Sequence, residues 1–181
     1  MKSTAMYILR LALTLLVITS VVAAALAGVN AITAPKIAAL TQQKTQAAIE
    51  AVLPGGGEKL ETFTDETGLV QAVYASDTGY AVQVAPAGFD GEITMMVGIS
   101  KEGTVLGIDI ISHTETAGLG AVAAANTSAG ESFRSQFAGA QGALAVSKDG
   151  GTIDAITGAT ITSRAVTDGV NAALACARAL G

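Results

Sequence analysis

Residues that bind metals or hold iron–sulfur clusters are almost absent from this sequence. Its 181 residues include one cysteine, Cys176, and one histidine, His113. A single cysteine excludes an intrachain disulfide, a cysteine-rich zinc site and a thiolate-ligated iron–sulfur cluster. We therefore predict no metal site, and if the protein handles electrons, an organic cofactor must carry them.

Basic clusters and aromatic residues are scarce as well. The net charge is −5, tryptophan is absent, and aromatic residues make up 4% of the chain. A nucleic-acid partner needs a basic patch for its phosphates or aromatic surfaces for its bases, so none is predicted. No nucleophile-elbow motif supports a Ser-His-Asp hydrolase, and no catalytic residue is predicted.

One long apolar run lies near the N-terminus. No charged residue occurs between positions 11 and 35. As a helix, residues 11–31 would extend about 31 Å, which is enough to cross the hydrocarbon core of a membrane. We predict a flank at residues 1–10 and a single-pass transmembrane anchor at residues 11–33.

A cleavable signal peptide is the alternative interpretation of this run. Lys2 and Arg10 supply positive charge before it, and residues 25–27, Ala-Leu-Ala, resemble a small-x-small cleavage site. The run is longer than the usual signal core of about 7–15 residues, which favours the retained anchor. Both interpretations place the following domain on the extracytoplasmic side of the cell membrane.

A helical pattern follows the apolar run. It belongs to residues 34–57 and ends at Pro54 and three successive glycines, which break a helix and form a joint. Two interpretations are open: a stalk that holds the next domain near the membrane, or an amphipathic helix packed on that domain. Residues 58–181 are predicted to form one extracytoplasmic domain.

The domain sequence predicts an α+β fold. Valine- and isoleucine-rich segments separated by turn residues indicate antiparallel β-hairpins. The predicted strands are residues 69–75, 80–85, 93–100, 104–112, 143–146 and 151–156. Residues 121–142 are predicted to be loop and helix, and a second helix is predicted from about Arg164. Strands and helices mix without a regular βαβ alternation, which is typical of α+β proteins.

Residues 154–163 form a polar junction before that last helix. They read Asp-Ala-Ile-Thr-Gly-Ala-Thr-Ile-Thr-Ser, with small residues that allow a large group to approach the backbone. Thr162 or Ser163 is the predicted N-cap, and free amides at a helix start favour a phosphate. Turn chemistry alone also explains such a composition.

Several motifs, in this order, carry a resemblance to a known family. After the apolar run come Gly79-Tyr80, Met-Val-Gly-Ile at 96–99, His-x-Glu-Thr-x-Gly-Leu-Gly at 113–120 and Asp-x-x-Thr-Gly-Ala-Thr-x-Thr at 154–162. Together they resemble the covalent-FMN-binding domain family over essentially the whole chain. Within it, the chain resembles the G subunits of Rnf-type ion-translocating ferredoxin:NAD oxidoreductases, relatives of the C subunits of Na⁺-translocating NADH:quinone reductases.

The resemblance implies a covalent flavin on Thr160. In the family, the last threonine of the Thr-Gly-Ala-Thr motif is joined to the phosphate of FMN by a phosphoester, and a separate flavin transferase supplies FMN from FAD. Asp154 begins that motif, either to present the segment to the transferase or to cap the loop. The neighbouring residues expected at the cofactor are Thr157, Gly158, Ala159, Thr162 and Ser163.

The 113–120 loop is the second segment that the resemblance places against the flavin. Its candidate ring contacts are Glu115, Thr116, Gly118 and Leu119. Ala117 departs from the family pattern, which commonly has proline there. His113 is a flavin neighbour or proton donor in one interpretation and a hydrogen-bonded loop histidine in the other.

The resemblance implies a membrane-anchored redox protein without substrate turnover of its own. Its expected partners are the membrane, the other membrane subunits of an Rnf-type translocase, and the flavin transferase that matures it. Two alternatives share the cofactor: a standalone extracytoplasmic flavin carrier, and the C subunit of a Na⁺-translocating NADH:quinone reductase. A third is a non-redox exported adaptor domain without flavin.

Overall fold

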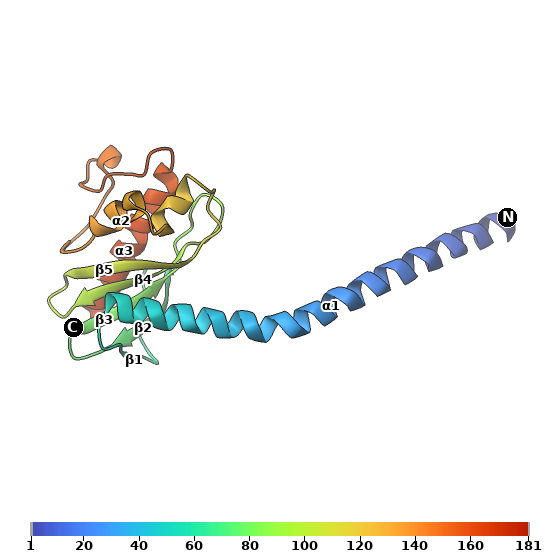
Figure 1. The fold of residues 1–181 in the computed structure, drawn as a ribbon, viewed down its shortest axis with the longest axis horizontal. Helices are drawn as coiled ribbons and strands as arrows, with labels where there is room; N and C mark the ends of the chain where they lie inside the picture. Colours follow the sequence, from blue (N-terminus) through green and yellow to red (C-terminus); the bar gives the residue numbers. More distant parts are fainter. Residues whose placement is uncertain (1, 181) are drawn as a thin grey trace. The chain divides into compact units, whose positions relative to one another are not determined.

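The computed structural model describes residues 2–180 and has the predicted α+β fold (Figure 1). A long N-terminal helix, α1, precedes an antiparallel sheet, β1–β5, and two further α-helices, α2 and α3. The chain divides after Gln43 into two units, the second of which holds the sheet and its covering helices. Each unit is described by itself below.

Helix α1 covers Lys2–Val52 and continues through Pro35. We expected the anchor and the following helix to be separate segments, but they form one helix, because the alanine-rich sequence on both sides outweighs the one hydrogen bond that proline removes. Its part from Met6 is long and apolar enough to cross a membrane, and the apolar window is not buried. The anchor limits at residues 11–33 stay a prediction.

The sheet is a meander in which every neighbouring pair of strands is antiparallel, in the order β1-β2-β3-β4-β5. The strands are β1 Glu58–Lys59, β2 Val70–Ala75, β3 Gly79–Val84, β4 Thr94–Ser100 and β5 Val105–Ser112. The four strands predicted from residues 69 to 112 are confirmed within about one residue at each end. Only the two-residue strand β1 was missed.

Helix α3, Thr160–Leu180, covers one face of the sheet with an apolar stripe that includes Val166, Val170 and Leu174. The same core contains Met95 of β4 and Cys176, which behaves as a small apolar residue. Figure 1 shows α3 passing behind the sheet. This face therefore holds the main core of the domain.

The last turns of α1 cover the opposite face. Ala48, Ile49 and Val52 are buried there against Met96 and other residues of the sheet. A side chain in place of Gly98 would collide with the carbonyl of Val52, so the helix lies directly on β4. Within the segment 34–57, these last turns pack on the domain, whereas Ile37 and Leu40 are exposed, so the choice between a stalk and a packed helix stays open for the earlier part.

Two short elements complete the domain before α3. The 3₁₀ helix η1, Gly120–Ala124, leads into α2, Ser128–Ser135, whose N-cap Thr127 accepts a hydrogen bond from the amide of Gly130. The rings of Phe133 and Phe137 meet edge to face, with centroids 5.5 Å apart. Loop and helix were predicted in this region, and both are present.

Two predictions for the segment before α3 are wrong. Residues 143–146 and 151–156 form no strand, and a single parallel bridge joins Val146 to Ile153. The side chain of Gln136 occupies the place of a strand partner, because it bonds both the amide and the carbonyl of Asp154, at 2.7 and 3.2 Å. Each hydrogen bond found at Asp154 is made by its backbone.

Helix α3 begins at Thr160, earlier than predicted, so neither Thr162 nor Ser163 is its N-cap. Both side chains are buried in the first turn instead. The Ser163 hydroxyl accepts from the amide of Ile156 at 3.0 Å and donates to the carbonyl of Ala159 at 2.9 Å. The buried Ser163 hydroxyl therefore links the preceding turn to the first turn of α3, which is consistent with a helix start at Thr160.

Candidate functional site

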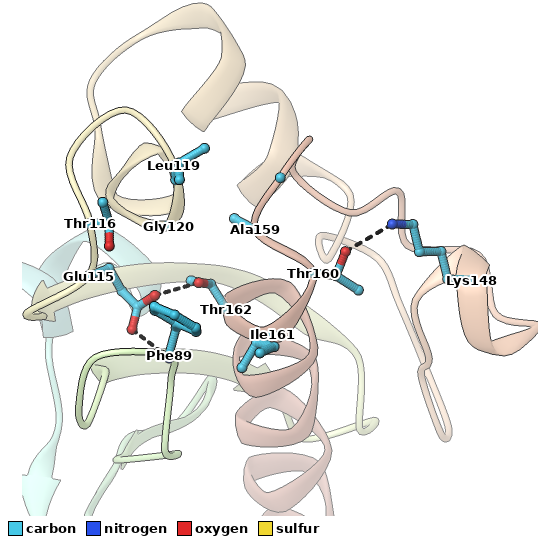
Figure 2. Close-up of a pocket in the computed structure, with 11 residues that line it drawn as sticks. Phe89, Glu115, Thr116, Leu119, Gly120, Lys148, Ala159, Thr160, Ile161 and Thr162 are labelled. Atoms are coloured by element: carbon cyan, nitrogen blue, oxygen red, sulfur yellow. Dashed lines mark hydrogen bonds between the residues drawn. The ribbon is translucent and has the colours of Figure 1, made fainter.

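Four separate segments surround a cavity of about 280 Å³ at the start of α3. They are the turn after β3, the loop after β5, the 3₁₀ helix η2, Ser147–Asp149, and the first turn of α3 (Figure 2). The lining residues are Phe89, Glu115, Thr116, Leu119, Gly120, Lys148, Gly158, Ala159, Thr160, Ile161 and Thr162. Both motifs singled out in the sequence therefore meet at one cavity.

Glu115 fastens three of these segments together. Its buried carboxylate accepts hydrogen bonds from the amides of Phe89 and Asp90, at 2.8 and 3.1 Å, and from the hydroxyl of Thr162, at 2.5 Å. A Cβ atom at Gly88 or Gly120 would collide with the carboxylate oxygens, so both glycines make room for it. With three donors on its oxygens, Glu115 holds the cavity wall in place.

Thr160 presents a hydroxyl at the edge of the cavity. It is the first residue of α3 and is partly exposed. Its Oγ1 accepts a hydrogen bond from Nζ of Lys148 at 3.0 Å, as Figure 2 shows. A hydroxyl, an ammonium group and the positive end of a helix dipole therefore share one place, which favours a bound anion such as a phosphate.

The residue after Lys148 in η2 forms an ion pair with α3. Asp149 accepts two hydrogen bonds from the guanidinium of Arg164, each 2.6 Å long. The two hydrogen bonds from Arg164 lower the pKa of Asp149, and the charges of Arg164 and Lys148 add to the effect, while the same hydrogen bonds raise the pKa of Arg164. The ion pair fixes η2 on the first turn of α3.

The outer rim of the cavity is apolar. Phe89, Ile161 and Leu119 are 66%, 49% and 44% exposed, which is high for large apolar side chains. Gly158, with φ of 76°, turns the chain beside Leu119. The terminal carbon Cδ2 of Leu119 would lie only 3.0 Å from a Cβ atom at that position. A flat apolar group could therefore lie between these side chains, close to the backbone.

The structure brings together seven of the eleven residues that the sequence nominated. Those that line the cavity are Glu115, Thr116, Leu119, Gly158, Ala159, Thr160 and Thr162. Gly118 and Thr157 line a neighbouring hollow, and Ser163 is buried within α3. His113 does not line the cavity, and among the described residues no partner lies within hydrogen-bond reach of its buried Nδ1.

Four lining residues were not predicted: Phe89, Gly120, Lys148 and Ile161. Gly120 is part of the motif at 113–120, and Ile161 lies between two nominated threonines, so position alone could have indicated both. Phe89 and Lys148 belong to turns that no motif marks. Within residues 2–180, no group of three or more histidine, cysteine or acidic side chains could hold a metal ion.

Comparison with known proteins gives one consistent result. Residues 88–175 match the FMN-binding domain. The chain is 36% identical to the G subunit of the Na⁺-translocating ferredoxin:NAD⁺ oxidoreductase complex of Acetobacterium woodii, over 91% of this chain and 88% of that protein. It is 37% identical to the G subunit of the proton-translocating ferredoxin:NAD⁺ oxidoreductase complex of Clostridium ljungdahlii, over 82% and 80%. The G subunit of an ion-translocating oxidoreductase complex of Methanosarcina acetivorans is 31% identical over 92% and 93%.

Proposed function

The chain belongs to the family of G subunits of ion-translocating oxidoreductase complexes, with its FMN-binding domain, and we propose that it carries FMN on Thr160 through a phosphoester. The observation that supports this most directly is the bond from Lys148 to the Thr160 hydroxyl. It sets a nucleophilic oxygen and a cation side by side at the mouth of the cavity. A phosphodiester formed there keeps one negative charge, which Lys148 and the helix dipole would neutralise.

The residues at the cavity fit this cofactor. Thr160 supplies the hydroxyl that an ester needs, and the small residues Gly158 and Ala159 leave room beside it. The cavity volume of about 280 Å³ is near the lower limit of typical small-molecule sites, about 300 Å³, so part of the cofactor would lie outside the cavity. The exposed side chains of Phe89, Leu119 and Ile161 would cover the apolar ring system there.

Bound FMN supplies reversible electron transfer, and the described residues bind and orient it. Glu115 holds the turn after β3, the loop after β5 and α3 in one arrangement through its three hydrogen bonds. Thr116 and Leu119 belong to the same loop and line the cavity wall. Electrons would pass to and from the ring by proximity, a role that requires no acid or base from the protein.

The protein is located at a membrane, and helix α1 is long and apolar enough to cross it. We propose that the FMN domain lies on the extracytoplasmic side, where a covalent bond prevents loss of the cofactor. The proposed partners are the other membrane subunits of an Rnf-type ferredoxin:NAD oxidoreductase and a flavin transferase for maturation. Similarity to G subunits over most of the chain favours this assignment over a standalone carrier or the C subunit of a quinone reductase.

The test is the flavin content of Thr160→Val and Thr160→Ser variants after co-expression with a flavin transferase. Valine has nearly the same shape as threonine but cannot form an ester, so Thr160→Val is expected to contain no covalent flavin. Serine keeps the hydroxyl, so Thr160→Ser should retain it. Denaturing gels read by flavin fluorescence give the answer, and covalent flavin in Thr160→Val would contradict the assignment.

A further inference from the structure

The cavity contains a single basic side chain, and its position has a consequence for how the cofactor is attached. Of the eleven residues that line the cavity, only Lys148 is positively charged, and only Glu115 is negatively charged. The Glu115 carboxylate is engaged by two amides and the Thr162 hydroxyl on the inner wall. The ammonium of Lys148 instead bonds the one hydroxyl, that of Thr160, to which we assign the ester.

Lys148 reaches Thr160 through a rigid turn. The amide of Ser147 donates to the carbonyl of Ile153 at 2.7 Å, and the amide of Gly151 donates to the carbonyl of Val146 at 3.1 Å. A Cβ atom at Gly151 would collide with the carbonyl of Ala145, so only glycine fits this closed turn. Backbone hydrogen bonds therefore close the turn on both sides of Lys148.

Side chains fix this turn to α3 at two successive residues. Lys148 contacts Thr160, and Asp149 contacts Arg164 through two bonds of 2.6 Å. Thr160 and Arg164 are four residues apart, so they occupy one face of α3 at a spacing of one helical turn. Two successive residues of η2 thus contact two positions of α3 that lie one helical turn apart.

We propose that Lys148 promotes the transfer of the flavin phosphate to Thr160 and then holds the phosphodiester, with Asp149 and Arg164 as its positioning residues. This inference rests on the function proposed above. In the reaction, Thr160 Oγ1 forms a bond to the flavin-side phosphorus of FAD. The bond from that phosphorus to the bridging oxygen breaks, AMP leaves with this oxygen, and the hydroxyl proton passes to water.

Lys148 acts in this step in two ways. It donates to Thr160 Oγ1, so the proton of the hydroxyl is directed away from the ammonium and is free to leave. Its charge lies where the phosphoryl oxygens must come, and a fixed charge that faces developing negative charge lowers the barrier without reorganisation. The acidic chain, with net charge −5, would otherwise repel the pyrophosphate of FAD.

The test measures the initial rate of flavin attachment by intact-protein mass, with purified flavin transferase and FAD, on the wild-type chain and three lysine variants. The Lys148→Gln variant should acquire flavin at least roughly tenfold more slowly than the wild type, which is the loss expected for one charge-assisted hydrogen bond. Lys148→Arg keeps the charge and should recover most of the rate. Lys101→Gln, which removes an exposed lysine from the β4–β5 turn, should match the wild type.

The positioning role has its own readout. Asp149→Asn should slow attachment about threefold in the wild-type background, because the ammonium is less well placed, and Asp149→Glu should restore part of the rate. In the Lys148→Gln background the same Asp149→Asn change should have no effect on the rate. A purely structural role would lower the rate equally in both backgrounds.

The outcomes separate the two proposals. A wild-type chain that gains no flavin, with the transferase active on another substrate protein, would overturn the function proposed for Thr160. A wild-type chain that is modified while Lys148→Gln reacts at the same rate would overturn only the role of Lys148. Lys148→Arg as slow as Lys148→Gln would also overturn it, since the charge would then not be the cause.

Discussion

Two threonine hydroxyls, only two residues apart in α3, lie on opposite walls of the cavity and have different hydrogen-bond partners. We call the wall with Thr162 and Glu115 the inner wall and the wall with Thr160 and Lys148 the outer wall. On the inner wall, Thr162 is 1% exposed and donates to the buried Glu115 carboxylate. On the outer wall, Thr160 is partly exposed and accepts from the exposed ammonium of Lys148. The Glu115 carboxylate accepts the proton of the Thr162 hydroxyl. The Lys148 ammonium donates to Thr160, so it does not engage the proton of the Thr160 hydroxyl.

The difference shows how one motif with several threonines can offer a single reactive hydroxyl. Burial and a carboxylate make Thr162 part of the framework, and exposure and a cation make Thr160 available to a large substrate. The inner wall should therefore matter for stability and the outer wall for modification. The predictions below test this division, beginning with the largest expected effect.

Glu115→Ala is expected to cause the largest loss of stability. The variant leaves the buried Thr162 hydroxyl, and the partly buried hydrogen bonds of the Phe89 and Asp90 amides, without their acceptor. We expect the free energy of unfolding to fall by roughly 2–4 kcal/mol, measured by urea denaturation. Glu115→Gln preserves shape and one acceptor oxygen, so its loss should be about 1 kcal/mol.

Equal stability of the Glu115→Ala variant and the wild type would show that the inner wall is not a framework. The effect on modification should follow the effect on folding. Where the Glu115→Gln domain remains folded, it should still acquire flavin, because no group that contacts the phosphate has been removed.

Gly120→Ala should have the next largest effect on the same wall. The added Cβ would collide with the Glu115 carboxylate and lie 2.5 Å from the Thr162 hydroxyl oxygen. We expect a loss of roughly 1–3 kcal/mol in the free energy of unfolding, since the buried neighbours must move. Gly107→Ala is the matched control, because nothing lies within 4 Å of its Cβ position. A loss as large in the control would mean that general backbone effects, and not the Glu115 contact, are responsible.

The outer wall should contribute little to stability, and its contribution should depend on pH. The hydrogen bonds from Arg164 lower the pKa of Asp149 below its ordinary value of 3.8. A lowered carboxylate pKa stabilises the fold above the ordinary value, and that stabilisation is lost as the pH falls through the lowered one. The melting temperature of Asp149→Asn should thus be slightly below that of the wild type at pH 7, and the difference should shrink as the pH falls below 3.8.

A difference that stays the same at acid pH would show that the Asp149–Arg164 pair does not fix the outer wall in solution. A large difference at pH 7 would equally contradict the division between the walls, because an exposed ion pair is expected to contribute little to stability.

The sheet could be predicted from the sequence because its signals are local. β2 to β5 consist of segments rich in apolar residues and separated by connections that contain turn-forming residues, and the ladder follows from their order. The start of α3 could not be predicted in the same way. Thr160 to Ser163 are weak helix formers by composition, and the helix begins there because Ser163 bonds Ile156 and Ala159.

The sequence predicted most residues of the candidate site that belong to the two motifs, but not those that lie outside them. The 113–120 and 154–162 motifs supplied Thr160, Thr116 and Leu119. They also supplied Glu115, but its structural role became evident only from its three hydrogen bonds in the structure. Lys148 carries no local signal, because its place beside Thr160 depends on a closed turn and on an ion pair between residues 149 and 164. Contacts of this kind arise from tertiary structure and produce no recognisable pattern in the sequence.

The most direct test of the account is the mass of the protein after co-expression with an active flavin transferase, with the modified peptide identified by fragmentation. The account predicts a gain of one FMN less one water, located on Thr160 and not on Thr157 or Thr162. An adduct on either of those neighbours, or an unmodified mass while the transferase modifies another substrate, would contradict it.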